Sequence, residues 1–208
     1  RSTHSTGRRQ RQMCIRDSIP DSATVIKLKF PMTRDKSETR KAWKEHAHTI
    51  IAELEKGRNV AFLTLGDSMT YSTYGYILKH VLTLAPHLEA QTVPGITSYQ
   101  AAAARLNTPL VEGEESLMIV SGIKGGDRLR RLSAKPENIV FLKAYRNVMD
   151  IKAAIDESGK YPSCVGVKCC GHPDEEIVKD IEELSRREPD YWTLILTKQA
   201  INNGSSDE

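Results

Sequence analysis

The sequence lacks the features that define several broad protein classes. No apolar run approaches the ~20 residues that a membrane-spanning helix needs. The net charge is only +3. Residues 1–18 carry +4, and the remainder, with 25 basic against 26 acidic residues, carries −1. We therefore expect a soluble, cytoplasmic protein that binds neither a membrane nor nucleic acid.

Cysteine is scarce and poorly spaced for either a metal site or a disulfide. Cys14 lies near the start of the sequence, and Cys164, Cys169 and Cys170 lie close to its end. Adjacent cysteines make an unfavourable disulfide pair, and no pair of Cys-x-x-Cys motifs is available for a zinc site. We expect buried, reduced thiols and no bound metal.

The motifs of nucleophilic and phosphate-binding enzymes are also missing. The segment GIKGGD at 122–127 has the glycines of a phosphate-binding loop. It lacks the lysine and hydroxyl that follow the last glycine of such a loop, so we expect a flexible polar segment instead. No side chain is identified as a catalytic nucleophile.

Residues 1–18 differ in character from the sequence that follows. They have no apolar periodicity and resemble translated adapter or vector sequence more than a targeting peptide, so we exclude them from the fold. A disordered basic arm that binds polyanions is the alternative. The polar residues 201–208 are expected to be a disordered tail.

Between these ends, segments with strand and helix patterns alternate. Strands are predicted at 25–30, 60–65, 88–93, 116–122, 138–144, 163–169 and 191–199, and helices at 37–57, 74–86, 98–107, 147–159 and 174–189. This alternation predicts a mainly parallel α/β fold. The polar break at 112–115 divides it into an N-terminal domain (19–115) and a C-terminal domain (116–200).

Three loops follow predicted strands, at the sheet edge where parallel α/β proteins bind ligands. In the first, Gly66 would let a ligand approach the backbone and Asp67 could accept from an amine or a hydroxyl. In the second, Thr97 and Ser98 follow a Pro-Gly turn. The third, KCCGHPDEE at 168–176, contains His172 as a candidate general base. Ordinary turns and helix caps are the alternative interpretation of all three.

Longer segments around these loops resemble the tetrapyrrole methylases that use S-adenosylmethionine. They are GDSMTYSTYGY at 66–76, VPGITSYQAAAARLNTPLVEGEE at 93–115 and FPMTRD at 30–35. Within the family they are most similar to members that methylate C20 of precorrin-2 or cobalt-factor-2, and the resemblance covers about residues 19–199. It implies two α/β domains with an active-site trough between them, a homodimer, S-adenosylmethionine as methyl donor and a tetrapyrrole as acceptor.

The resemblance also implies which positions contact the donor. Nine residues match donor-contacting positions of the family: Gly66, Asp67, Met69, Tyr71, Thr97, Ser98, Lys143, Cys170 and Gly171. Because the donor carries its own leaving group, no protein nucleophile is required. Basic residues would meet the carboxylates of the acceptor, and Arg34, Lys36, Arg105 and Arg128 are candidates.

Two departures from the family pattern bear on activity. Ser68 stands where members typically have proline after Gly-Asp, which we expect to loosen the turn. The family's first strand and its glycine-rich loop have no match in residues 1–24. We therefore expect part of the active site to be missing and activity to be impaired. Methylation of another tetrapyrrole position, or donor binding without turnover, remain as alternatives.

Overall fold

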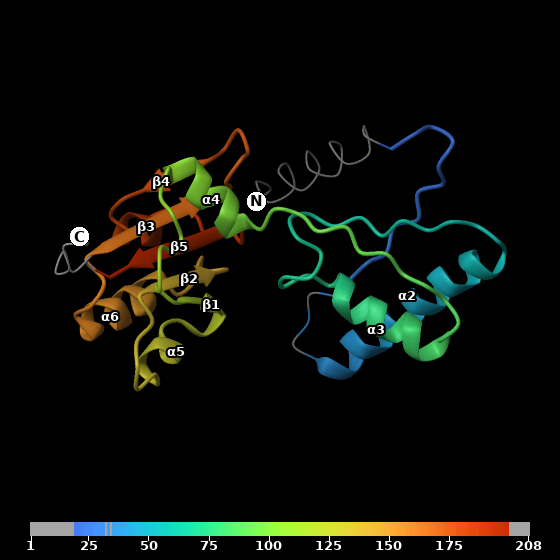
Figure 1. Cartoon of the computed structure of the whole chain (residues 1–208), viewed down its shortest axis with the longest axis horizontal. Coiled ribbons are helices and arrows are strands. Elements are labelled where there is room, and N and C mark those ends of the chain that lie inside the picture. Colours follow the sequence, from blue (N-terminus) through green and yellow to red (C-terminus); the bar gives the residue numbers. More distant parts are fainter. Residues whose placement is uncertain (1–18, 32, 34, 200–208) are drawn as a thin grey trace. The chain divides into compact units, whose positions relative to one another are not determined.

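The structure of the chain is a computed structural model that describes residues 19–31, 33 and 35–199 (Figure 1). The predicted leader, the predicted tail, Cys14 and Arg34 lie outside the described residues. Contacts divide the chain into two compact units. The described residues up to Leu63 form the first unit together with Thr73–Gln91, and Thr64–Ser72 form the second with the residues from Thr92 onward. Residues 92–115, assigned to the N-terminal domain from sequence, thus group with the second unit by contacts.

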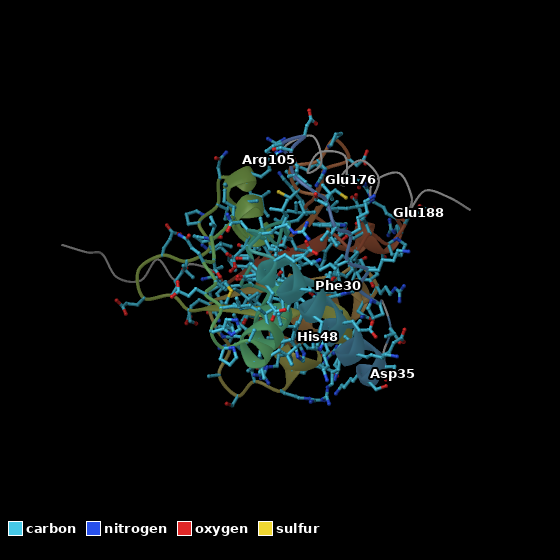
Figure 2. The ribbon with its side chains drawn as sticks, turned by 90° about the vertical axis from the view of Figure 1, so that its right-hand side faces the viewer. Phe30, Asp35, His48, Arg105, Glu176 and Glu188 are labelled. Carbon is cyan, nitrogen blue, oxygen red and sulfur yellow. The ribbon has the colours of Figure 1, made fainter. Side chains whose placement is uncertain are left out.

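The first unit contains two helices, α2 (Lys36–Glu55) and α3 (Tyr74–Leu84). The prediction that Ser37 caps α2 is wrong. Asp35, labelled in Figure 2, caps the helix, and its side chain accepts hydrogen bonds from the backbone amides of Ser37 and Glu38. An aspartate one residue before the first turn places its carboxylate closer to these unpaired amides than a serine inside the turn can.

The core of the first unit lies between the two helices. Ala47 and Ile51 of α2 are buried against Ile77 and Val81 of α3, and each pair has the four-residue spacing of one helix face. The rings of Trp43 and Tyr76 stack with their centroids 4.2 Å apart.

Three predicted strands are absent from the part of the chain that the structure describes. Residues 25–30, 60–65 and 88–93 form no strand pairing there. Leu63 and Val93 remain 56% and 76% exposed. An apolar or β-branched run favours a strand only when a neighbouring strand supplies its ladder of hydrogen bonds, and none is paired with these runs.

The second unit is built on a five-stranded sheet in the order β1-β2-β5-β3-β4. Its strands are β1 (Leu117–Ser121), β2 (Asn138–Leu142), β3 (Ser163–Lys168), β4 (Glu176–Val178) and β5 (Thr193–Lys198). Only β1 and β2 are parallel, so the prediction of a mainly parallel sheet is wrong here. The connection from β3 to β4 is too short for a parallel crossover, which takes a dozen residues or more.

The prediction of one long helix at 174–189 is also wrong. This segment forms β4 and then a single helical turn, α7 (Glu182–Ser185). Ile177 and Val178 pair with β3, which uses their β-branched side chains in a sheet. The segment after β1, predicted to be flexible, instead forms a 3₁₀ turn, η1 (Gly122–Lys124), and α5 (Asp127–Arg130). The Asp150 carboxylate fixes this segment by accepting from the Gly126 amide at 2.8 Å.

Two helices cover opposite faces of the sheet (Figure 1). Ile139 and Phe141 of β2 pack in the same cluster as α6 (Val148–Ser158), whereas Val140 packs in the same cluster as Ala102 of α4 (Ser98–Leu106). All five residues of β2 are buried, as expected for a central strand covered on both faces. None of the described helices combines the length and apolar character needed to cross a membrane.

Candidate functional site

Asp67 joins the first two candidate loops. Its Oδ1 accepts a hydrogen bond from the Gly95 amide at 3.1 Å, and its Oδ2 accepts from the Met69 amide at 2.9 Å. The bond from Gly95, followed by one from the Thr70 side chain, lowers the pKa of the Asp67 carboxyl below its usual 3.8. The carboxylate is therefore ionised at neutral pH, and both of its oxygens already accept hydrogen bonds from backbone amides of the two loops.

The two loops meet backbone to backbone. A Cβ atom added to Gly95 would lie only 2.3 Å from the carbonyl oxygen of Gly66, so no larger residue fits without displacing the turn. Gly66 itself has φ = 71°, in the left-handed region that favours glycine. Asp67 and Gly95, 28 positions apart in sequence, are also joined by a hydrogen bond at this contact.

Ser68 adds a further link between these loops. Its side chain is buried, and its hydroxyl donates to the carbonyl of Val93 at 3.2 Å. Proline, which the family typically has here, has no hydroxyl to make this bond. The departure from the family pattern therefore supplies a contact that ties the first loop to the segment before Pro94.

The second loop ends in a well-formed helix cap. Thr97 and Gln100 form a capping box at the start of α4, in which each side chain bonds to the backbone amide of the other residue. The Thr97 hydroxyl also donates to Gln100 Oε1 at 2.8 Å. The interpretation of Thr97 as a cap is confirmed, and Ser98 begins the helix. Donor contact by this pair stays a prediction.

Tyr71 and Lys143 also lie together. Lys143 directly follows β2, and its Nζ lies 5.9 Å from the ring centroid of Tyr71 and 5.3 Å from that of Tyr191. The Tyr71 hydroxyl donates to the carbonyl of Ile119 in β1 at 3.3 Å. The first loop is therefore attached to the sheet as well as to the second loop.

The late loop is tied to α4 through Glu175. This carboxylate accepts from the Gly171 amide at 2.7 Å and from Nε of Arg105, in the last turn of α4, at 2.5 Å. Both contacts lower the pKa of Glu175, with the Gly171 amide contributing most. Arg105, predicted to meet acceptor carboxylates, thus already has a partner within the protein. Of the other candidates, Lys36 begins α2 in the first unit and Arg128 is exposed in α5.

The three described cysteines show no sign of a disulfide, a reactive thiolate or a metal site. In the described part of the chain, no disulfide joins Cys164, Cys169 or Cys170. Cys169 is buried, as expected, whereas Cys164 and Cys170 are only half-buried. Burial raises the pKa of Cys164 to about 12, and burial followed by the charge of Glu175 raises the pKa of Cys170, so neither forms a thiolate readily at neutral pH. Within the described residues, no group of three or more acidic, histidine or cysteine side chains could hold a metal ion.

All nine predicted donor-contacting residues lie in the second unit. The structure brings the Gly66 loop against the Gly95 loop, and Tyr71 against Lys143. Cys170 and Gly171 are connected to α4 rather than directly to Asp67. Tyr191, which the sequence pattern indicates only as the start of a strand, also lies here. Its position just before β5 is the signal that it lies at the same sheet edge as Lys143.

The fold and the linked loops define a mixed α/β protein with a candidate small-molecule site on its second unit. Residues 5–185 match the family model of the Tetrapyrrole (Corrin/Porphyrin) Methylases, a match that begins inside the segment predicted to be a leader. The chain belongs to this family, whose methyl donor is S-adenosylmethionine.

Curated relatives agree with this membership. The chain is 30% identical to the cobalt-precorrin-2 C(20)-methyltransferase of Salmonella typhimurium, over 89% of the chain and 78% of the relative. It is 32% identical to the probable cobalt-precorrin-2 C(20)-methyltransferase of Methanocaldococcus jannaschii, over 89% of the chain and 76% of the relative.

Among solved structures, the fold matches a cobalamin-synthesis-related protein from Corynebacterium diphtheriae with a TM-score of 0.65, at 19% identity, over 95% of this chain and 84% of that one. It matches the uroporphyrin-III C-methyltransferase of Thermus thermophilus, solved with S-adenosylhomocysteine, with a TM-score of 0.55 at 21% identity, over 75% and 73% of the two chains. These likenesses support the fold.

Proposed function

We propose that the chain transfers a methyl group from S-adenosylmethionine to C20 of precorrin-2 or cobalt-factor-2, a step of cobalamin biosynthesis. The observation that carries the proposal is the similarity to two C20-methyltransferases, at 30% and 32% identity over 89% of the chain. Loops that could hold the donor are already fixed to one another by Asp67, Ser68 and the glycine contact.

The donor would lie against the first two loops. Exposed apolar side chains, including Met69 and Ile96, flank the bare backbone of Gly66 and suit the aliphatic chain and the flat base of the donor. The ionised Asp67 favours a cationic sulfonium nearby even though its oxygens bond to amides. These properties fit the donor. Eight of the predicted residues form the proposed donor site: Gly66, Asp67, Met69, Tyr71, Thr97, Ser98, Cys170 and Gly171.

The sulfonium of S-adenosylmethionine supplies an activated methyl group and its leaving group together. The tasks left to the chain are to bind both reactants, to align the acceptor carbon with the methyl and to exclude water. Rigid loops serve these tasks well. The backbone amides of Gly95, Met69 and Thr70 and the side chain of Thr70 hold Asp67. Gly95 leaves no space for the loops to slide closer, so the donor surface is preorganised.

We also propose that the protein is a cytoplasmic homodimer. The family resemblance implies the dimer and two domains, and the polar break at 112–115 favours a division near residue 115. The dimer can be tested by light scattering at several protein concentrations. A mass that stays at 23.3 kDa over the concentrations used for activity would contradict it.

Methyl transfer from a ¹³C-labelled donor tests the reaction. The full chain is incubated with the labelled donor and, in separate reactions, cobalt-factor-2, precorrin-2 and uroporphyrinogen III, and the product is examined by ¹³C NMR. We expect one label, at C20, from at least one of the first two acceptors. Label at another carbon would support a different ring position. Donor binding with no labelled product from any acceptor would support a binding domain without turnover.

A further inference from the structure

One edge of the sheet in the second unit gathers aromatic and basic side chains. The carboxyl ends of β1, β2 and β3 lie at this edge together with the start of β5, because β5 runs antiparallel to both β2 and β3. Lys143 follows β2 here, and Tyr191 and Trp192 precede β5. Tyr71 reaches the same edge through its bond to Ile119 and its contact with Lys143.

Unusual backbone conformations are concentrated in this region. Four described non-glycine residues have positive φ: Tyr71 (52°), Asn107 (48°), Lys143 (57°) and Cys169 (51°). Asn107 ends α4, a common use of the left-handed conformation. The other three lie in the loop that carries Tyr71 or directly after β2 and β3. Bulky residues adopt this conformation rarely, and such outliers are found preferentially at functional sites.

The ammonium of Lys143 has no anionic partner among the described residues. Its side chain is partly buried between the rings of Tyr71 and Tyr191, at 5.9 and 5.3 Å from their centroids. Aromatic faces attract a cation but do not accept its three N–H donors in full. The other lysines at the ends of this sheet behave differently: Lys168 pairs with Glu176, and Lys198 pairs with Glu112. Lys143 is thus placed to bind an external anion.

A row of rings extends from this lysine. The ring of Tyr191 lies 5.7 Å from that of Tyr145 and 6.3 Å from that of Trp192, and both Tyr191 and Trp192 are partly exposed. The guanidinium of Arg146, also exposed, lies 5.1 Å from the Tyr145 ring. The surface therefore offers flat apolar area beside two cations, which suits a flat ligand that carries carboxylates.

We propose that Lys143, flanked by Tyr71 and Tyr191, binds a carboxylate arm of the tetrapyrrole acceptor, while the rings of Tyr191 and Trp192 pack against the macrocycle. This inference rests on the proposed function and gives Lys143 a role different from the donor contact that the family resemblance implies. The donor has one carboxylate, but it also brings a sulfonium and an ammonium, both of which the Lys143 ammonium repels. The acceptor brings several carboxylates, which an ammonium attracts.

Two substitutions separate charge from packing. Lys143→Met keeps the apolar stem and removes the charge, and Lys143→Arg keeps the charge. Lys160→Met, at an exposed lysine before β3 and so at the opposite end of the sheet, is the matched control. Each full-length variant is titrated with cobalt-factor-2 by absorbance and with S-adenosylhomocysteine by calorimetry, after circular dichroism has confirmed that it is folded.

We expect Lys143→Met to weaken binding of the acceptor about tenfold or more, the range for losing a charge-assisted hydrogen bond. Lys143→Arg and the control should stay within about threefold of the wild type, and binding of S-adenosylhomocysteine should be unchanged in all. The acceptor affinity of the wild type should also fall more steeply with added salt than that of Lys143→Met.

Weaker binding of S-adenosylhomocysteine with unchanged acceptor binding would assign Lys143 to the donor's carboxylate and overturn the inference. Unchanged binding of both ligands would show that the lysine is only a surface charge. A wild type that binds S-adenosylhomocysteine but not cobalt-factor-2 would also overturn it, while leaving the donor site intact. A folded wild type that binds neither ligand would contradict the proposed function as well.

Discussion

Replacing Gly95 with alanine should separate the two loops that we assign to the donor. The added Cβ would lie 2.3 Å from the carbonyl oxygen of Gly66, and real Cβ atoms essentially never come nearer than 3.0 Å to such an atom. The turns must therefore part by about 0.7 Å, at the point where the Gly95 amide bonds to Asp67 at 3.1 Å. Overpacking of this kind costs about 1–3 kcal/mol, which corresponds to a Tm lower by about 2–12 °C for a domain of this size.

Thermal unfolding measures this loss, and calorimetry with S-adenosylhomocysteine measures its consequence for the donor site. Gly75→Ala is the control, because a Cβ there meets nothing within 4 Å and the residue lies in the first turn of α3. Alanine should leave stability unchanged or raise it by up to about 1 kcal/mol at that position. A Gly95→Ala protein with the Tm and donor affinity of the wild type would refute the loop contact.

Three further outcomes are expected. Folding lowers the pKa of Asp67, so the stabilising contribution of this carboxylate is present above its usual pKa of 3.8 and is lost as the pH falls through the lower folded-state value. Asp67→Asn should therefore flatten the fall in Tm as the pH is lowered below 3.8. Cys164, with a pKa of about 12, should resist alkylation by iodoacetamide at pH 8 in the folded protein but not in urea, as read by mass spectrometry. Arg105→Met should increase amide hydrogen exchange at Gly171, because Glu175 loses the partner that helps to fix it; exchange equal to the wild type would contradict this link.

Local sequence pattern was sufficient for much of the second unit. The runs at 117–121, 138–142, 163–168 and 193–198 form strands within a residue or two of their predicted bounds, and α6 follows the predicted spacing. These runs succeed because each has a neighbouring strand to pair with. The equally apolar run at 60–65 has none in the described chain, and no property of its own residues reveals that.

Strand direction and loop contacts were harder to predict. Ile177 and Val178 suit a helix face and a strand about equally. The connection from β3 is too short for a parallel crossover, so these residues form an antiparallel strand. At the candidate site, the sequence identified both glycine turns and Asp67. The contact of Asp67 with the donor stays a prediction. The structure adds a bond from the Gly95 amide to this carboxylate, a contact that no local pattern encodes.

The most direct test of the proposed donor site is a titration of S-adenosylhomocysteine into the full chain and into Asp67→Ala, with the fold of both confirmed by circular dichroism. The account predicts binding by the wild type and a loss of about tenfold or more in the variant, because the amides of Gly95 and Met69 both lose their acceptor. Equal affinity in the two proteins would place the donor elsewhere and contradict the assignment of these loops.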